Sequence, residues 1–415
     1  MKTDITQGIP TMFILKSVYC RVFQAGFRIA LPFLPYRDPE IIRSCRDLGG
    51  VFKKENITSV LIVTDKGIVN NGLTVSVEEA LKKSGVSYIV YDRTQPNPTV
   101  HNVEDAFALY QKHNCDCLIA VGGGSSMDCA KAVGSRAAYP GKTIGQMKGI
   151  LKIHRKLPTL IAIPTTAGTG SETTLAAIIT DSDTHDKCAL MSFPLIPGYA
   201  VLDAELTYSL PAHLTSTTGM DALTHAVEAY IGRSTTKETR RLALDAVKLI
   251  FDNIENAYSD GRNHTARENM LHAAYKAGSA FSKSYVGYIH AVAHSLGGQY
   301  GTPHGLANAI TMPYVLEAYG PCIHKKLHRL GIAAGICSES DSPETGAIKF
   351  IAAVKQLNRH MNIPDKIQSI IKEDIPALAE KAEKEANPLY PVPKLMTRRE
   401  LEAFYHQLAD WSKES

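Results

Sequence analysis

The amino-acid sequence predicts two domains in series, an α/β domain built on a parallel sheet and then an all-α domain. In the first half, short runs of Val, Ile and Leu alternate with helix-length segments, a pattern typical of strands that are buried on both faces. After Pro211 the pattern changes to long amphipathic stretches such as ETRRLALDAVKLIFDNIENAY. At 415 residues the chain is long enough for two cores. We therefore expect a Rossmann-like α/β domain over residues 38–210 and a helical domain over residues 211–415.

Four apolar runs are the expected strands of the first domain. They are SVLIVTD (59–65), VSYIVYD (86–92), DCLIAVG (116–122) and TLIAIPT (159–165). The second domain is expected to end with a proline-containing strap and a closing helix, within ANPLYPVPKLMTRRELEAFYHQL.

Charge and cysteine usage exclude some classes of function. The chain has 45 basic and 41 acidic residues, a formal net charge of +4, and no basic run interleaved with aromatics. Nucleic acid is therefore not an expected partner. The eight cysteines are scattered, without a C-x-x-C motif, and this favours reduced thiols in a cytoplasmic protein.

The N-terminal extension, residues 1–37, is rich in apolar side chains from residue 9 onward. Lys16, Arg21 and Arg28 interrupt the apolar pattern, so no stretch approaches the roughly 20 residues that cross a bilayer. We expect no integral membrane segment. The favoured interpretation is an amphipathic extension that packs on the body of the protein or on another subunit, and a peripheral membrane anchor is the alternative.

Four residues have the types and spacing of metal ligands. Asp221 and His225 are four residues apart among good helix formers, so both side chains project from one helical face. His290 and His304 can complete a mixed oxygen and nitrogen shell, which suits iron or zinc better than calcium or magnesium. Histidines also cap helices or pair in cores, and this is the alternative interpretation.

A glycine-rich turn, VGGGSSMDCAKAVGS, follows the third expected strand. Gly123 and Gly124 let the backbone approach an anion closely, and a helix that opens at Ser125 or Ser126 offers unpaired N–H groups. The turn predicts a site for a pyrophosphate. Met127 replaces the last glycine of the usual fingerprint, so a tight turn without ligand remains the alternative.

Two further features suggest a dinucleotide. Asp65 ends the first long strand, where a carboxylate can accept hydrogen bonds from a ribose and repel a 2′-phosphate, which favours NAD over NADP. The alternative interpretation is that Asp65 only caps a helix or forms a turn. IPTTAGTGSE follows another strand and supplies the hydroxyls of Thr165, Thr166 and Thr169, although such a turn is also ordinary loop chemistry.

The motifs GGGSSMD, PTTAGTGSE, GMDALTHAVEAY and the H-x-x-x-H segment that leads to TPHG occur in this order, from about residue 38 to the C-terminus. With them the chain resembles the iron-containing (group III, metal-dependent) alcohol dehydrogenase family. The resemblance implies Fe(II), or alternatively Zn(II), held by the four ligands named above. It also makes His294 a proton-relay or substrate-orienting residue.

The resemblance further places a set of residues around the dinucleotide, and these are Asp65, Asn97, Gly123, Gly124, Ser125, Thr165, Thr166, Thr169 and Lys187. There is one departure from the family pattern. Where several relatives carry Asn soon after the threonine-rich turn, this chain has Ala176.

The implied activity is interconversion of primary alcohols, or small diols, and aldehydes by hydride transfer with NAD(H). The expected partners are a small-molecule alcohol or aldehyde and a second copy in a homodimer. Two alternatives remain open. One is a non-redox, metal-dependent synthase or lyase with the architecture of dehydroquinate synthase, and the other is a non-catalytic dinucleotide-binding regulator.

Overall fold

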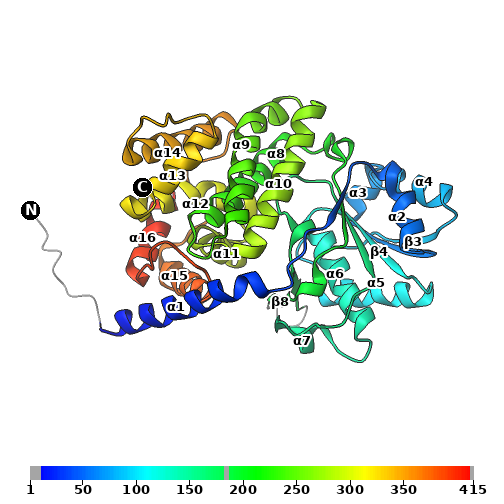
Figure 1. The fold of residues 1–415 in the computed structure, drawn as a ribbon. Coiled ribbons are helices and arrows are strands. Elements are labelled where there is room, and N and C mark those ends of the chain that lie inside the picture. Colours follow the sequence, from blue (N-terminus) through cyan, green and yellow to red (C-terminus); the bar gives the residue numbers. More distant parts are fainter. Residues whose placement is uncertain (1–10, 182–186, 412–415) are drawn as a thin grey trace, which may run out of the picture. The chain divides into compact units, whose positions relative to one another are not determined.

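The computed structural model describes residues 11–181 and 187–411 (Figure 1). The described chain forms two compact units. The sheet unit contains Pro35–Ala222 and Leu249–Ser282, and the helical unit contains the N-terminal helix α1 (Thr11–Ala30), Leu223–Lys248 and the chain from Lys283 onward. The domain limits of 38–210 and 211–415 stay a prediction.

The sheet unit is built on a six-stranded parallel sheet with the order β1-β9-β6-β4-β2-β3. In chain order the strands are β1 (Glu40–Ile42), β2 (Ser59–Val63), β3 (Ser87–Tyr91), β4 (Cys117–Gly122), β6 (Thr159–Pro164) and β9 (Tyr199–Val201). The four expected strands and the parallel sheet are confirmed. Strands β1 and β9 are additional, and three residues each is too short for a recognisable pattern.

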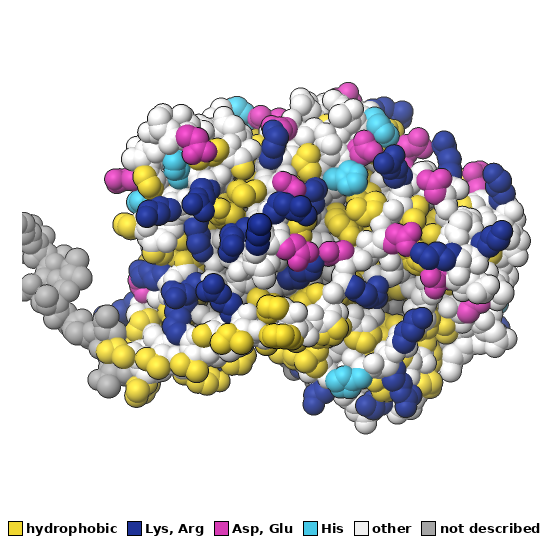
Figure 2. Space-filling view, in the orientation of Figure 1, with side chains coloured by type: hydrophobic (Ala, Val, Ile, Leu, Met, Phe, Trp, Pro, Cys, Tyr) yellow, Lys and Arg dark blue, Asp and Glu magenta, His cyan; other side chains and the backbone are white. Residues whose placement is uncertain are grey.

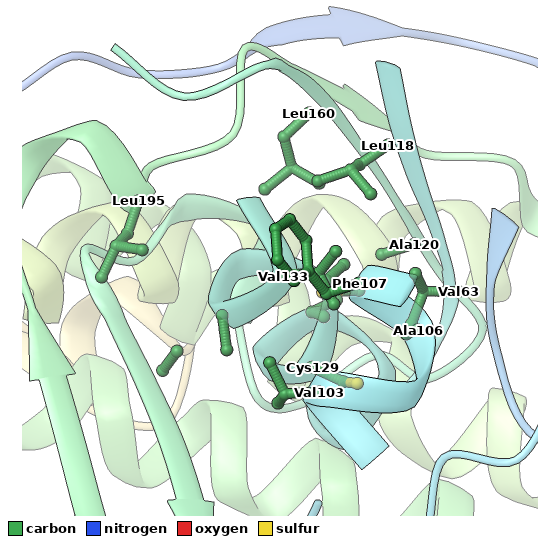
Figure 3. Close-up of a cluster of buried hydrophobic side chains, with 14 of the residues drawn as sticks. Val63, Val103, Ala106, Phe107, Leu118, Ala120, Cys129, Val133, Leu160 and Leu195 are labelled. Atoms are coloured by element: carbon green, nitrogen blue, oxygen red, sulfur yellow. The ribbon is translucent and has the colours of Figure 1, made fainter. Parts of the chain in front are cut away.

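Helices cover both faces of this sheet (Figure 1). They are α2 (Leu48–Lys54), α3 (Lys66–Asn70), α4 (Val75–Lys83), α5 (Val100–Lys112) and α6 (Gly124–Ala138). Alternate residues of one strand enter different cores. Leu118 and Ala120 of β4 pack with Phe107 of α5 and Val133 of α6 (Figure 3), whereas Ile119 belongs to the cluster on the opposite face. Because both faces of the sheet are buried, the sequences of these strands are continuous apolar runs.

The chain reverses direction across the sheet at β2, since β3 lies on one side of β2 and β4 on the other. In open α/β sheets, ligands bind beyond the carboxyl ends of the strands at such a point. Gly122 ends β4 there with φ of +145°, and a Cβ at this residue would lie 2.5 Å from Oγ of Ser126. Glycine is therefore required, and this requirement places the glycine-rich turn at the reversal point.

A second, three-stranded sheet was not expected. It consists of β5 (Gly149–Ile150), β7 (Ala176–Thr180) and β8 (Lys187–Met191), in the order β5-β8-β7, and the four-residue helix α7 (Ile144–Met147) precedes it.

From residue 211 to residue 411 the structure has helices and no strand, which confirms the expected helical second half. The helices are α8 (Ala212–Ile231), α9 (Lys237–Ser259), α10 (His264–Ser284), α11 (Tyr288–Tyr300), α12 (His304–Tyr319), α13 (His324–Ala333), α14 (Pro343–His360), α15 (Ile375–Ala386) and α16 (Arg398–Leu408). The strap before the closing helix α16 is also as expected. Among the described residues, no helix combines the length and apolarity that crossing a bilayer requires.

Candidate functional site

Three helices bring the four predicted metal ligands together. Asp221 and His225 lie one turn apart on α8, His290 lies in the first turn of α11, and His304 is the first residue of α12. Their potential ligand atoms, one from each side chain, all lie within 4.8 Å of one another. Asp221, His225 and His290 are buried and His304 is exposed, so the cluster is open on one side. Three imidazoles and one carboxylate form a donor set that fits a single Fe(II) or Zn(II) ion.

Glu228, which the sequence interpretation missed, orients one of these histidines. Its Oε2 accepts from Nδ1 of His290 at 2.7 Å and from the backbone N–H of Gly287 at 2.7 Å, and its Oε1 accepts from the N–H of Ile289 at 2.8 Å. Because Nδ1 donates to the carboxylate, Nε2 of His290 carries the lone pair that a cation needs. Glu228 follows His225 by one helical turn within HAVEAY, a spacing that could have revealed it.

Glu228 is buried and lies in close contact with the start of α11. Burial raises the pKa of Glu228 to about 8, while the N–H groups of Gly287 and Ile289 and His290 favour the ionised form and lower it. A Cβ on Gly287 would lie 2.7 Å from Oε1 of Glu228, so glycine is needed at that position. The start of α11 thus holds the carboxylate of Glu228 in place, and this carboxylate in turn orients His290.

His294 lies one turn beyond His290 on α11, beside the metal-ligand cluster. Its ring stacks on that of His304 with 5.1 Å between centroids, and its side chain is 37 % exposed. Nδ1 of His294 is 2.5 Å from Oε1 of Glu385 on α15, and the same oxygen accepts from the hydroxyl of Tyr390 at 2.7 Å. Glu385 therefore holds the ring so that Nε2 is left for a substrate or water. Glu385 could not be recognised from the sequence, because it lies 91 residues from His294.

In the sheet unit, the glycine-rich and threonine-rich turns lie side by side beyond β4 and β6. The N–H of Thr165 donates to the carbonyl of Gly122 at 3.1 Å. Gly123 is the N-cap of α6 and Gly124 is its first residue, and a Cβ on Gly124 would lie 3.3 Å from Cγ2 of Thr169. The N-terminus of a 15-residue helix and the adjacent hydroxyls make a cradle that fits a pyrophosphate.

The remaining predicted dinucleotide residues lie on several elements of the same unit. Ser125 is in the first turn of α6, and a Cβ on Gly123 would lie 3.7 Å from Oγ1 of Thr166, so Thr166 also borders the cradle. Asp65 is the N-cap of α3 and accepts from the N–H of Ile68 at 3.0 Å. A cap role for Asp65 is therefore present in the structure, and it leaves the second carboxylate oxygen for a further acceptor role.

Asn97 and Lys187 are placed differently. Asn97 is exposed in the loop between β3 and α5 and has φ of 57°, in the left-handed region that Asn tolerates. Lys187 is exposed at the start of β8. Both residues lie outside the two turns.

Lys131 on α6, another residue that the sequence interpretation missed, fixes the end of the threonine-rich turn. Its fully buried Nζ donates to Ser171, Thr174 and Ala176 through five contacts of 2.7–3.1 Å. Burial lowers the pKa of Lys131 to about 8, while Asp128 raises it. Ala176, the departure from the family pattern, takes part through its carbonyl, so this contact is independent of the side chain there.

Two family models match the chain. The model described as "Iron-containing alcohol dehydrogenase" matches residues 42–204, and the model described as "Fe-containing alcohol dehydrogenase family, C-terminal" matches residues 215–409. Together they cover the glycine-rich turn, the threonine-rich turn and the histidine cluster, and they begin after α1.

Named relatives and a solved structure agree with the models. The chain is 37% identical over 367 residues to 1,3-propanediol dehydrogenase of Klebsiella pneumoniae, covering 88% of this chain and 92% of the relative. It is 35% identical over 342 residues to NAD-dependent methanol dehydrogenase of Bacillus methanolicus, covering 81% and 89%. The structure of an alcohol dehydrogenase from Oenococcus oeni is similar with a TM-score of 0.86 and 35% identity, over 90% of this chain and 100% of that one.

Proposed function

The chain belongs to the iron-containing alcohol dehydrogenase family, and we propose that it interconverts a primary alcohol or small diol and the corresponding aldehyde by hydride transfer with NAD(H). It is an oxidoreductase that acts on CH–OH groups. The observation that carries the proposal is the cluster of Asp221, His225, His290 and His304, with their potential ligand atoms within 4.8 Å of one another.

The proposed cofactors are Fe(II), with Zn(II) as the alternative, and NAD. When bound, the cation supplies Lewis acidity toward an alcohol or aldehyde oxygen, and the nicotinamide accepts or donates the hydride. The family description favours iron, although the mixed donor set also suits zinc. In the proposed site the carboxylate of Asp65 would face the ribose and would repel a 2′-phosphate, which favours NAD. The relative named as an NAD-dependent methanol dehydrogenase supports the same choice.

The protein groups have distinct tasks in this proposal. Glu228 fixes the tautomer of His290, so the nitrogen that faces the cluster is basic. His294, partly exposed and oriented by Glu385, is suited to orient the substrate and to exchange its hydroxyl proton with water. The glycine-rich and threonine-rich turns would hold the pyrophosphate.

The alternative functions fit less well. A synthase or lyase that acts on an acidic substrate needs several basic side chains, but residues 281–304 contain one, Lys283, and its Nζ forms an ion pair with Glu238 at 2.9 Å. A non-catalytic regulator would have no use for a complete ligand set with an orienting carboxylate behind it.

Several finer expectations belong to the same proposal. We propose a homodimer, a cytoplasmic location, the domain limits 38–210 and 211–415, and binding of the dinucleotide by the predicted residues, including Asn97 and Lys187.

The test is a substrate panel of short primary alcohols, small diols and their aldehydes. It is run in both directions with NAD and NADP, on protein stripped of metal and then loaded separately with Fe(II) or Zn(II). We expect formation of reduced nicotinamide with metal-loaded protein and none after stripping. Full activity of the stripped protein would contradict the proposal.

A further inference from the structure

The outward face of α1 is apolar. More than half of the exposed large hydrophobic side chains among the described residues lie between Met12 and Phe33. Six of them lie along one side of the helix and the turn that follows it, three, four or seven residues apart, at Met12, Leu15, Tyr19, Val22, Ile29 and Phe33. Val22 is 67% exposed and Ile29 is 72% exposed. Single exposed apolar residues are ordinary, but a continuous stripe marks an interaction surface.

This exposure is not the result of a detached helix, because the opposite face of α1 is anchored to the helical unit. Arg21 donates to the carbonyl of Val392 at 2.7 Å, and Gln24 donates to the carbonyl of Tyr390 at 2.8 Å. Lys16 forms an ion pair of 2.6 Å with Glu383 on α15. Lys16, Arg21 and Gln24 thus bind the helical unit.

Aromatic packing adds to this anchor. Phe27 meets Tyr285 edge to face with 5.0 Å between ring centroids. Cys20, on the same side of the helix, is buried. Since polar and aromatic contacts fix one face of α1, the apolar stripe is held on the other.

Positive charge borders the apolar stripe on the side of the helical unit. The sequence from residue 11 to residue 34 contains Lys16, Arg21 and Arg28 and no acidic residue. Burial, and then the nearby cations Arg233, Arg240 and Arg28, lower the pKa of Lys326 to about 8, so these groups lie close together. Figure 2 shows the apolar row along α1 with Lys and Arg side chains gathered beside it on the helical unit.

This combination fits a lipid surface better than a second copy of the chain. A symmetric contact through α1 would bring one positively charged patch against another, since an isologous interface pairs a patch with itself and residues 11–34 contain no acidic residue. An apolar helical face flanked by cations complements a bilayer that carries anionic headgroups. Helix α1 also precedes residue 42, where the family match begins, so the common chemistry of the family does not explain it.

We propose that α1 is a peripheral membrane anchor, whose apolar stripe enters the headgroup region of a bilayer while the neighbouring cations contact anionic lipid headgroups. The helix lies in the plane of the interface and does not span the bilayer. The proposal is independent of the substrate and of the metal, because none of its residues belongs to the histidine cluster or the two turns.

The test is sedimentation of the full-length, metal-loaded protein with vesicles of phosphatidylcholine alone or with phosphatidylglycerol added. We expect the protein to bind the anionic vesicles. Binding should weaken as the salt concentration rises, because the Debye length falls from about 10 Å at 0.1 M to about 3 Å at 1 M. The double variant L15Q/V22Q should bind the anionic vesicles at least about tenfold more weakly. Gln is a good helix former, so α1 should persist.

Matched controls use α14, which Figure 1 shows on the other side of the helical unit from α1. The variant Ile348→Gln replaces a side chain that is 62% exposed and should bind as the wild type does. Arg28→Gln should weaken binding to anionic vesicles, while Arg359→Gln, also exposed, should not. All four variants should keep the wild-type turnover.

Four outcomes would overturn the proposal or one part of it. One is the absence of sedimentation with anionic vesicles, and another is unchanged binding of L15Q/V22Q. The third is that L15Q/V22Q has a lower native mass than the wild type and that neither protein binds vesicles. This outcome would show that the stripe contacts a second copy of the chain. Equal binding to both kinds of vesicle would overturn the role of the anionic headgroups.

Discussion

The histidine cluster and the pair of glycine-rich and threonine-rich turns are built by different means. In the cluster, four side chains from three helices converge, and their identity decides what can bind. At the turns, backbone shape decides, since Gly122 leaves no room for a Cβ beside Ser126 and a Cβ on Gly124 would press on Thr169 at 3.3 Å. Both sites nevertheless depend on a buried charge behind them, Glu228 for the cluster and Lys131 for the threonine-rich turn.

These two buried charges act in opposite ways. Glu228 accepts hydrogen bonds and makes one ligand more basic, so it tunes chemistry. Lys131 donates to oxygens of the segment from Ser171 to Ala176, so it fixes a loop. A change behind the cluster should therefore first alter metal binding, whereas a change behind the turns should first alter stability.

The largest effect is expected from removing a ligand. His304→Ala leaves three ligands, so the protein should lose metal and its turnover should fall below detection. Dinucleotide binding should be largely kept, because the two turns are untouched. Metal analysis, turnover and a fluorescence titration with NADH measure the three quantities. His324→Ala, outside the cluster, is the control, and substantial metal-dependent turnover in His304→Ala would remove His304 from the ligand set.

The second effect tests the turn side of the comparison. Lys131→Met should lower the free energy of unfolding by about 3–5 kcal/mol, because Asp128 and the oxygens of Ser171 and Thr174 lose their buried cation. Urea denaturation measures this loss, and NADH should also bind more weakly. The exposed Lys112→Met should change stability by no more than about 0.5 kcal/mol. A loss below about 1 kcal/mol in Lys131→Met would show that the turn holds its shape without the ammonium.

The third effect tests the cluster side. Glu228→Gln should weaken metal binding by about 10- to 100-fold, because an amide cannot accept from Gly287, Ile289 and His290 together. Competition with a chelator of known affinity measures the change. The exposed Glu339→Gln is the matched control. Unchanged metal affinity would mean that Glu228 serves only to cap the start of α11.

The parts of this molecule that could be predicted from the sequence are those whose pattern is local. The strands that end at Val63, Gly122 and Pro164 are apolar along their whole length because both faces are covered, and Asp221 and His225 share a helical face by spacing alone. Edge strands of three residues carry no such pattern. Whether the apolar face of α1 points inward or outward was equally inaccessible, since periodicity does not say which face meets the protein.

The residues behind the sites could not be predicted because their partners are distant along the chain. Glu228 and His290 are 62 residues apart, and Lys131 and Ser171 are 40 residues apart. A lone Glu or Lys on a helix is ordinarily a solvated residue, and its role exists only once the fold brings it to a buried partner.

The smallest effect concerns Asp65, where cap and cofactor roles coincide in one side chain. Asp65→Asn keeps the cap on Ile68, since Asn and Asp cap helices about equally well, but it removes the charge. We therefore expect unchanged stability and a ratio of catalytic efficiencies, NAD over NADP, that falls about tenfold, or about 1.4 kcal/mol. Asp65→Ala should show the same change in ratio and lose about 1 kcal/mol of stability as well, because the cap is gone. If the ratio is unchanged in Asp65→Asn while Asp65→Ala is destabilised, Asp65 acts as a cap alone, and the preference for NAD must come from another residue near the carboxyl end of β2.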